Sequence, residues 1–261
     1  MRVAVTGWTG NIGRLLTKNL ERSGFEVIRV GRQPQADYQI DLSLALDDLA
    51  VAPYCDVLVL LAWYTDHPHF WMSQLNEVFV DTSIKLVTRF QTTNPNIRVI
   101  GAGSCAELYS TSQSKYELGH AKRRLRQLLE NTCGVSTTWF QIFFAYGPGE
   151  PETKLLPIIK HNNDPSHLIK EPGAVRDFIH FDDISLTIEE SITDVRQGCF
   201  HLGRGYGYLI EDLIQYKLSG KTPPTHLFSE RSKWTDFKVA NPAQCWPGRK
   251  NDDQILQWLR E

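Results

Sequence analysis

Three glycines near the start of the chain, Gly7, Gly10 and Gly13, most constrain what it can fold into. The apolar run 3–5 precedes them, and apolar residues follow them at helical spacing. Glycine suits such a junction because the turn needs positive φ, the backbone must approach a pyrophosphate, and the helix must pack closely on the strand. The helix would direct unpaired N–H groups and the positive end of its dipole at the anion. The spacing G-x-x-G-x-x-G therefore predicts dinucleotide binding, against the alternative of a glycine-rich turn that binds nothing.

Predicted strands and helices alternate along most of the 261 residues. We expect strands at 25–30, 57–62, 97–102, 137–144 and 199–203, long helices at 70–90 and 113–130, and a helical turn at 255–259. This alternation predicts an α/β fold with a doubly wound parallel sheet of Rossmann type and a small C-terminal substrate-binding portion. We assign 1–147 to the dinucleotide-binding core, to which 176–204 returns, and 148–261 mainly to substrate binding.

Composition excludes several classes of function. The net charge of −2 gives no reason to expect nucleic acid or an anionic membrane as a partner. We expect no signal peptide before the early glycine turn, and no apolar run is long enough to span a bilayer. The five cysteines are scattered without a C-x-x-C pair. They predict reduced thiols in a cytoplasmic protein and no metal site.

The ends of the predicted strands supply further candidates for cofactor binding. Arg32 follows the second strand, where an arginine suits the 2′-phosphate of NADP and an acid would suit NAD. Arg32 thus favours NADP, with NAD as the other candidate, unless it is only a solvated surface residue. The predicted cofactor contacts are Gly7, Trp8, Thr9, Gly10, Asn11, Ile12, Gly13, Arg32, Asp41, Leu42, Leu61, Ala62, Trp63 and Lys122.

Several motifs resemble those of the extended short-chain dehydrogenase/reductase family, and within it those of the nucleotide-sugar epimerases and dehydratases. They occur in the same order as in that family. They are the glycine turn, Leu60-Leu61-Ala62, 103–107 (G-S-C-A-E), 146–149 (Y-G-P-G) and 176–183 (R-D-F-I-H-F-D-D). The resemblance covers about residues 1–210. It implies a nicotinamide dinucleotide cofactor, a nucleotide-sugar substrate and a homodimer.

Members of this family carry a Ser/Thr together with a tyrosine and a lysine spaced Y-x-x-x-K. A neighbouring ammonium stabilises the phenolate, whose free pKa near 10 would otherwise prevent it from acting as a base at neutrality. The present helix lacks this spacing. In one register Leu118 stands in the tyrosine position before Lys122; in the other Tyr116 stands there and His120 replaces the lysine. Helical phase favours the first register, since Leu118 shares the apolar face that would turn to the sheet.

The first register has a chemical consequence. Leucine cannot carry a proton, and loss of a positioned base typically costs about 10²–10⁴-fold in rate. Tyr116 could take over only if the chain before Leu118 is not helical. We therefore predict an NAD(P)-dependent oxidoreductase, epimerase or dehydratase acting on a nucleotide sugar. The alternative is an impaired relative that binds NADP(H) as a sensor or partner protein.

The resemblance assigns roles to the remaining candidates. Ser104 is the expected Ser/Thr, unless its hydroxyl only satisfies a backbone group at the end of the strand. An offset of one residue would select Cys105 in its place. Glu107 resembles the acid of dehydratases, with an exposed loop glutamate as the alternative. Arg176 matches the arginine that binds the nucleotide diphosphate, a bidentate task, unless it only forms a surface ion pair with Asp177 or Asp182. The predicted catalytic residues are Ser104, Tyr116 and Lys122, and the predicted substrate-binding residues are Glu107 and Arg176.

Overall fold

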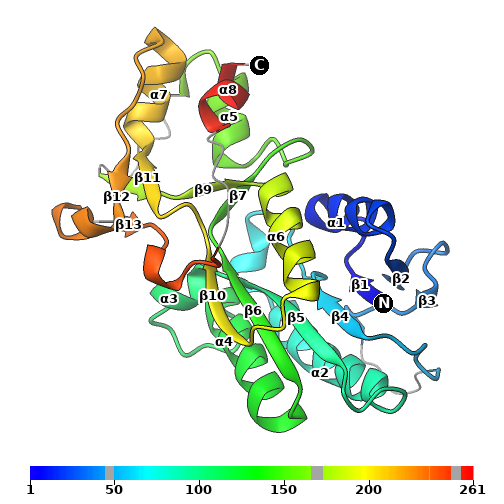
Figure 1. Ribbon diagram of the computed structural model, residues 1–261. Coiled ribbons are helices and arrows are strands. Elements are labelled where there is room, and N and C mark those ends of the chain that lie inside the picture. The colour runs from blue at the N-terminus through cyan, green and yellow to red at the C-terminus, as the bar shows by residue number, and fades with distance from the viewer. Residues whose placement is uncertain (45–49, 166–172, 235, 248–253, 261) are drawn as a thin grey trace. The chain divides into compact units, whose positions relative to one another are not determined.

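A seven-stranded, mostly parallel sheet forms the centre of the computed structural model, which describes residues 1–44, 50–165, 173–234, 236–247 and 254–260 (Figure 1). The strand order is β10-β6-β5-β4-β1-β2-β3. Strand β1 pairs in parallel with β2 on one side and β4 on the other, and β4 pairs in parallel with β5. The strands are β1 Arg2–Thr6, β2 Glu26–Gly31, β3 Tyr38–Gln39, β4 Val57–Leu60, β5 Arg98–Ser104, β6 Ser136–Ile142 and β10 Gly198–Leu202. The predicted doubly wound α/β fold is confirmed.

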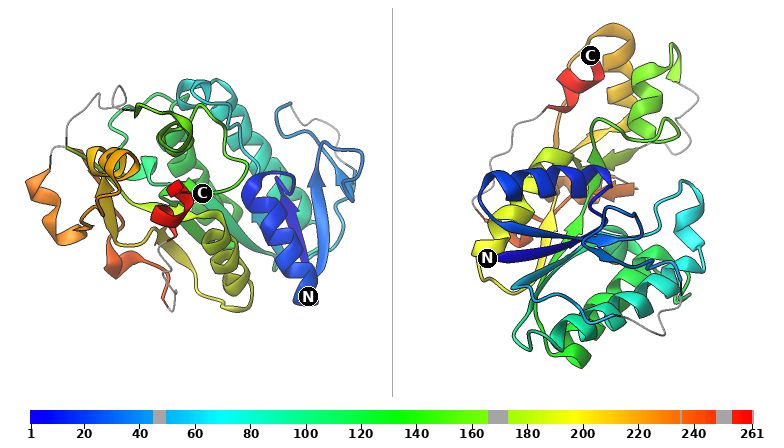
Figure 2. Two further views of the ribbon diagram at one scale, coloured as in Figure 1. Left: turned by 90° about the horizontal axis from the view of Figure 1, so that it is seen from above. Right: turned by 90° about the vertical axis from the view of Figure 1, so that its right-hand side faces the viewer.

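Helices cover both faces of this sheet (Figures 1 and 2). On one face α1 (Asn11–Arg22) and α6 (Phe181–Thr193) lie side by side, and Ser23, at the end of α1, donates a hydrogen bond to Glu189 at 2.5 Å. On the other face lie α2 (Leu75–Gln91) and α4 (Leu118–Leu128). Strands β4 and β1 are buried along nearly their whole length, as expected of central parallel strands.

The largest apolar core lies between the sheet and the α2–α4 face. Its members come from β1, β2, β4 and β5 and from the inner faces of the two helices. Trp139 of β6 is wholly buried here, and Gly101 on β5 makes room for it, since a Cβ there would lie 2.2 Å from the indole. Close packing of this kind fixes the strand ends from which the candidate site is built.

Two predicted helices are shorter in the structure than the apolar pattern indicates. Residues His69–Met72 form a separate 3-10 turn, because Ser73 is extended and its Oγ accepts the N–H of Leu75. Helix α4 begins at Leu118 and not at residue 113, and a π turn, Leu129–Cys133, follows it. Ser112 and Ser114 each accept a backbone N–H two residues further on, which competes with helix formation before Leu118.

The chain forms two compact units, 1–141 with 185–199, and 142–184 with 200–261. The second unit contains a four-stranded sheet of order β12-β11-β8-β13 and the parallel pair β7–β9. Its helices α5, α7 and α8 share an apolar cluster that includes Tyr146 and Trp258. The bounds are β7 Phe144–Tyr146, β8 Ala174–Arg176, β9 Phe178–His180, β11 Tyr206–Leu209, β12 His226–Leu227, β13 Asp236–Lys238, α5 Leu155–His161, α7 Ile210–Ser219 and α8 Ile255–Arg260.

Within the described ranges, no helix combines the length and the apolar character that crossing a bilayer requires.

Candidate functional site

The glycine turn between β1 and α1 has the geometry that its spacing predicts. Gly7 has φ +66°, and the N–H of Gly10 donates to the Gly7 carbonyl at 3.0 Å. A Cβ on Gly13 would lie 2.1 Å from that carbonyl oxygen, and a Cβ on Gly7 would lie 2.8 Å from the backbone nitrogen of Ala62. Side chains at these two positions would therefore open the turn.

The amino end of α1 fits an anionic group. Gly10 is the N-cap residue, so no side chain caps the helix, and the first turn contains no acidic residue. A Cβ on Gly10 would meet only the Gly7 carbonyl oxygen within 4 Å, at 3.3 Å. Helix α1 has twelve residues and begins with Asn11 and Ile12. Its aligned peptide dipoles give this end a partial positive charge. These residues therefore match the requirements of a pyrophosphate.

The carboxyl end of β4 lies against the same turn. The N–H groups of Leu61 and Ala62 both donate to Thr6 Oγ1 at 3.0 Å. This hydroxyl ties the end of β4 to the end of β1. The structure thus brings together the glycine turn and the predicted contacts Leu61 and Ala62.

The end of β2 also reaches the turn. The Trp8 indole lies beside Gly31, and Thr9 Oγ1 accepts a hydrogen bond from Gln33 at 3.4 Å. Arg32, between these two contacts, is exposed. Its guanidinium is thus available at the position where an adenosine ribose is expected.

The predicted cofactor contacts Asp41 and Leu42 differ in their surroundings, which are polar for Asp41 and apolar for Leu42. Burial alone would raise the pKa of Asp41, but hydrogen bonds from Ser43 and the charge of Arg32 lower it. Leu42 packs its side chain into the core, and its carbonyl accepts a hydrogen bond from Thr82 at 2.8 Å. The Leu42 side chain is therefore part of the core and does not face a ligand.

Lys122 lies on the buried face of α4, together with Leu118. Its Nζ donates to the Ala102 carbonyl at 2.7 Å and lies 3.7 Å from the centroid of the Trp63 ring. Burial lowers the pKa of Lys122 to about 7, although the charge of Glu107 acts in the opposite direction. Lys122 is therefore poised to gain or lose a proton near neutrality.

Tyr116 lies in the non-helical segment before α4. Its carbonyl accepts a hydrogen bond from Asn76 at 2.8 Å, and the Lys115 amine lies 5.4 Å from its ring centroid. The side chain is half-buried. The chain before Leu118 thus has the non-helical form that Tyr116 would need in order to replace a tyrosine at position 118.

Ser104 ends β5 and uses its hydroxyl locally, since Oγ accepts the N–H of Ala106 at 3.2 Å. Cys105, the alternative residue, is buried at the start of α3 (Ala106–Tyr109). Ser104 and Cys105 therefore both lie at the carboxyl end of β5, where α3 begins.

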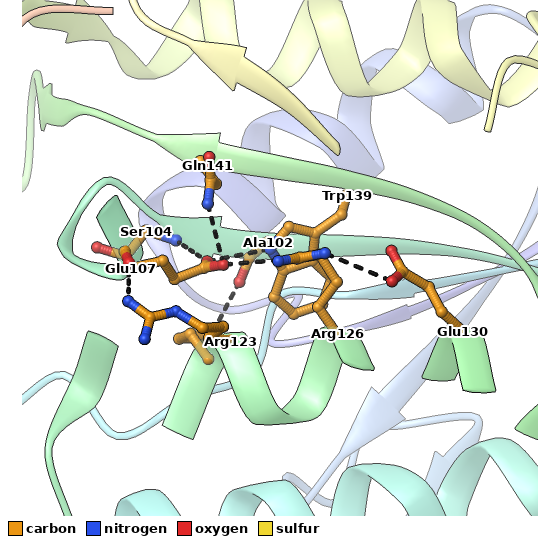
Figure 3. A network of polar contacts seen from close by, with 9 residues as sticks. Ala102, Ser104, Glu107, Arg123, Arg126, Glu130, Trp139 and Gln141 are labelled. Atoms are coloured by element: carbon orange, nitrogen blue, oxygen red, sulfur yellow. Dashed lines mark hydrogen bonds and ion pairs between the residues drawn. The ribbon is translucent and has the colours of Figure 1, made fainter. Parts of the chain in front are cut away.

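Glu107 is buried and not an exposed loop residue (Figure 3). Its carboxylate accepts hydrogen bonds from the Ser104 N–H at 2.9 Å, from Trp139 Nε1 at 3.0 Å and from Gln141 Nε2 at 3.1 Å. Arg126 lies 3.7 Å away. Burial raises the pKa of Glu107 against these hydrogen bonds. The carboxylate is thus engaged in holding the end of β5 in place.

Arg176 belongs to the second unit and pairs with Asp236. The same guanidinium donates to the Asp236 carbonyl at 3.1 Å and lies 5.3 Å from the centroid of the Phe144 ring. The neighbouring Asp177 is wholly buried and accepts backbone N–H groups, including that of Arg204 at 2.7 Å. Arg176 would have to exchange its aspartate partner for a phosphate to bind a nucleotide.

A cavity of about 190 Å³ lies in the second unit, between the loop after β7 and helices α5 and α8. Glu150, Lys160 and Trp258 are among its lining residues, and the Lys160 amine lies 4.5 Å from the centroid of the Trp258 ring. Burial raises the pKa of Glu150 to about 7, although Lys154 lowers it from 3.5 Å away. The Lys160 amine thus lies over the Trp258 ring, and the polar groups that line the cavity are a carboxyl and an amine.

Asn76 and Trp139 are site residues that the sequence reasoning missed. Asn76 is wholly buried and links Trp63 to the Tyr116 segment. No local pattern distinguishes such a residue from a polar residue at the start of a helix, since its partners are 13 and 40 positions away. Among the described residues, no group of three potential ligands is placed to hold a metal ion.

Comparison with known proteins assigns the chain to a family. A family model described as the NAD dependent epimerase/dehydratase family matches residues 3–197. No curated protein sequence matches the chain.

Solved structures share the fold at low sequence identity. UDP-glucose 4-epimerase of Thermus thermophilus, in complex with NAD, has a TM-score of 0.70 at 15% identity, covering 99% of this chain and 98% of that one. An NAD-dependent NDP-hexosamine 5,6-dehydratase of tunicamycin biosynthesis has a TM-score of 0.72 at 17% identity, covering 98% and 95%. A human epimerase family protein with NADPH has a TM-score of 0.56 at 18% identity, covering 78% and 75%.

Proposed function

The chain belongs to the NAD-dependent epimerase/dehydratase family, and from that premise we propose that it binds a nicotinamide dinucleotide and acts on a nucleotide sugar. The observation that carries the proposal is the geometry of the Gly7–Gly13 turn. The Gly10 N–H donates to the Gly7 carbonyl, and glycine at position 10 leaves the amino end of α1 without a side chain. The similar structures include a UDP-glucose 4-epimerase in complex with NAD and an epimerase family protein with NADPH. The exposed Arg32 favours NADP over NAD.

The chemistry divides between the cofactor and the protein. When bound, the dinucleotide accepts or returns a hydride. The side chains must orient the reacting sugar hydroxyl and move its proton. We assign orientation to Ser104, and proton movement to Lys122 together with Tyr116. Lys122 contributes an amine that titrates near neutrality, and Tyr116 contributes a phenol from the non-helical segment that precedes α4.

Substrate binding belongs, in this proposal, to the second part of the chain, about residues 148–261. The cavity beside Trp258 supports it, because Glu150 and Lys160 line the cavity and polar groups of this kind bind the hydroxyls of a sugar ring. Arg176 is the proposed phosphate contact, and Glu107 acts on substrate only through Ser104. Residues 1–147, with 176–204, remain the proposed dinucleotide-binding part.

A second function is favoured by Leu118. This residue is only 6% exposed and occupies the tyrosine position in the favoured register, where it cannot move a proton. The chain would then bind NADP(H) as a sensor or as a partner for another protein. A homodimer and a cytoplasmic location belong to either version of the proposal.

Supplying nucleotide sugars to the protein loaded with oxidised or reduced cofactor separates the two functions. Catalysis predicts a change in the absorbance of the reduced nicotinamide, or an epimerised or dehydrated sugar detected by mass spectrometry and NMR. The Tyr116→Phe variant should lower this rate by about 10²-fold or more if the phenol moves the proton. Cofactor binding without any turnover across UDP-, GDP- and dTDP-sugars would support the sensor function.

A further inference from the structure

The amine of Lys122 is enclosed between two partners. On one side it donates to the Ala102 carbonyl at 2.7 Å, and on the other it faces the indole of Trp63 at 3.7 Å from the ring centroid. The residue is 6% exposed. Because so little water reaches the amine, these two contacts largely determine its position.

Trp63 is itself fixed. Its Nε1 donates to Asn76 Oδ1 at 2.8 Å, and its ring packs against Phe79 with centroids 5.5 Å apart. The same Asn76 amide donates to the Phe70 carbonyl at 2.7 Å and to the Tyr116 carbonyl at 2.8 Å. One wholly buried amide thus orients the indole and holds the segment that carries Tyr116.

An indole face attracts a cation, and the attraction grows when water is excluded. Burial favours the neutral amine and lowers the pKa of Lys122, and Glu107 opposes this effect. An indole face that attracts the charged amine acts in the same direction as Glu107. Among the described elements that pack against α4, Glu107 of α3 is the carboxylate that acts on Lys122. Glu77 of α2 faces Arg124, at 2.6 Å.

We propose that Trp63, oriented by Asn76, is a positioning residue for Lys122, and that its indole face serves as the electron-rich partner that Leu118 does not provide. The proposal deepens the proposed function and rests on it for the use made of Lys122. The contact itself is a property of the protein without cofactor. It can therefore be tested independently of turnover.

The test is an NMR titration of the lysine side chains in the cofactor-free protein, with the Lys122 signal assigned from its loss in Lys122→Met. We expect Trp63→Leu to lower the pKa of Lys122 by about one pH unit, and Trp63→Phe to lower it by less than half as much. An unchanged or raised pKa of Lys122 in Trp63→Leu would overturn the proposal.

Fluorinated tryptophan provides a measurement that keeps the shape of the ring. Each added fluorine weakens the attraction of the indole for a cation, so the pKa of Lys122 should fall stepwise with the number of fluorines. A Lys122 pKa that does not respond would also overturn the proposal.

Calorimetry with NAD and NADP on the same samples separates this proposal from the proposed function. If the unlabelled protein binds neither dinucleotide while the titration behaves as expected, the proposed function fails and the contact stands. If the protein binds a dinucleotide but the pKa of Lys122 does not change in the Trp63 variants, the proposed function stands and the role of Trp63 fails.

Discussion

The glycine turn of residues 7–13 and the helix start around Leu118 are both parts of the candidate site, but they differ in what the chain retains. The turn keeps all three glycines, and at Gly7 and Gly13 the close backbone contacts leave no room for a side chain. At the helix start the lysine remains, while a leucine occupies the tyrosine position of the favoured register. The difference teaches that holding a dinucleotide and moving a proton are separable demands. Backbone geometry meets the first, and the second needs one particular side chain.

Gly13→Ala should have the largest effect on this comparison. A Cβ 2.1 Å from the Gly7 carbonyl oxygen must open the turn, so we expect dinucleotide affinity to fall by on the order of 1,000-fold in calorimetry. The control is Gly24→Ala, where φ is +81° and nothing lies within 4 Å of the new Cβ. It should cost about 1–2 kcal/mol of stability and leave binding unchanged. Equal losses of affinity in both variants would mean that the loss comes from general destabilisation of the protein and not from the glycine turn.

Lys122→Met tests the buried amine through stability. The unfolded lysine keeps its proton to about its ordinary pKa of 10.5, whereas the folded one releases it near 7. Between these values the unfolded chain binds more protons, so wild-type stability should rise with pH. The free energy of unfolding of wild type relative to Lys122→Met should increase by on the order of 3 kcal/mol between about pH 7 and 10.

Urea unfolding at several pH values measures this difference, and Lys18→Met, at an exposed position, provides the control. A pH-independent difference for Lys122→Met would show that the amine stays protonated in the folded protein.

Leu118→Tyr sharpens the comparison from the catalytic side. If the first register is right and the base is missing, the new phenol should raise turnover of a nucleotide sugar by about 100-fold. Leu118→Phe adds the ring without the hydroxyl and carries a similar packing cost of about 1–3 kcal/mol. Equal turnover in the two variants, measured by nicotinamide absorbance, would argue against the register.

Arg32→Ala should have the smallest effect. Loss of the guanidinium should weaken NADP binding by about tenfold and leave NAD binding within a factor of about two. Arg14→Ala, an exposed position on α1, removes a charge of the same sign from the same unit. If both variants weaken NADP equally, Arg32 contributes only general positive charge.

The sequence predicted the parallel sheet because its signals are local. A glycine turn and continuous apolar runs such as 57–60 are typical of central parallel strands, and the structure contains them at nearly the predicted bounds. The start of α4 was placed too early because Ser112 and Ser114 capture backbone N–H groups in a segment whose composition suits a helix.

The site was harder to predict because its contacts are distant in sequence. Glu107 is held by Trp139 and Gln141, which lie 32 and 34 residues further along. Lys122 contacts Trp63 across 59 positions, and only the folded sheet brings them together. Local patterns in the sequence indicate which residues are candidates for the site. The role of each candidate depends on its burial and on its partners in the folded protein.

Calorimetry of the cofactor-stripped protein with NAD and NADP tests the central claim most directly. The Gly7–Gly13 turn should bind a nicotinamide dinucleotide saturably at one site per chain, with NADP the tighter, and Gly13→Ala should weaken that binding on the order of 1,000-fold. Absence of binding by either dinucleotide would contradict the account, whatever the outcome at Lys122.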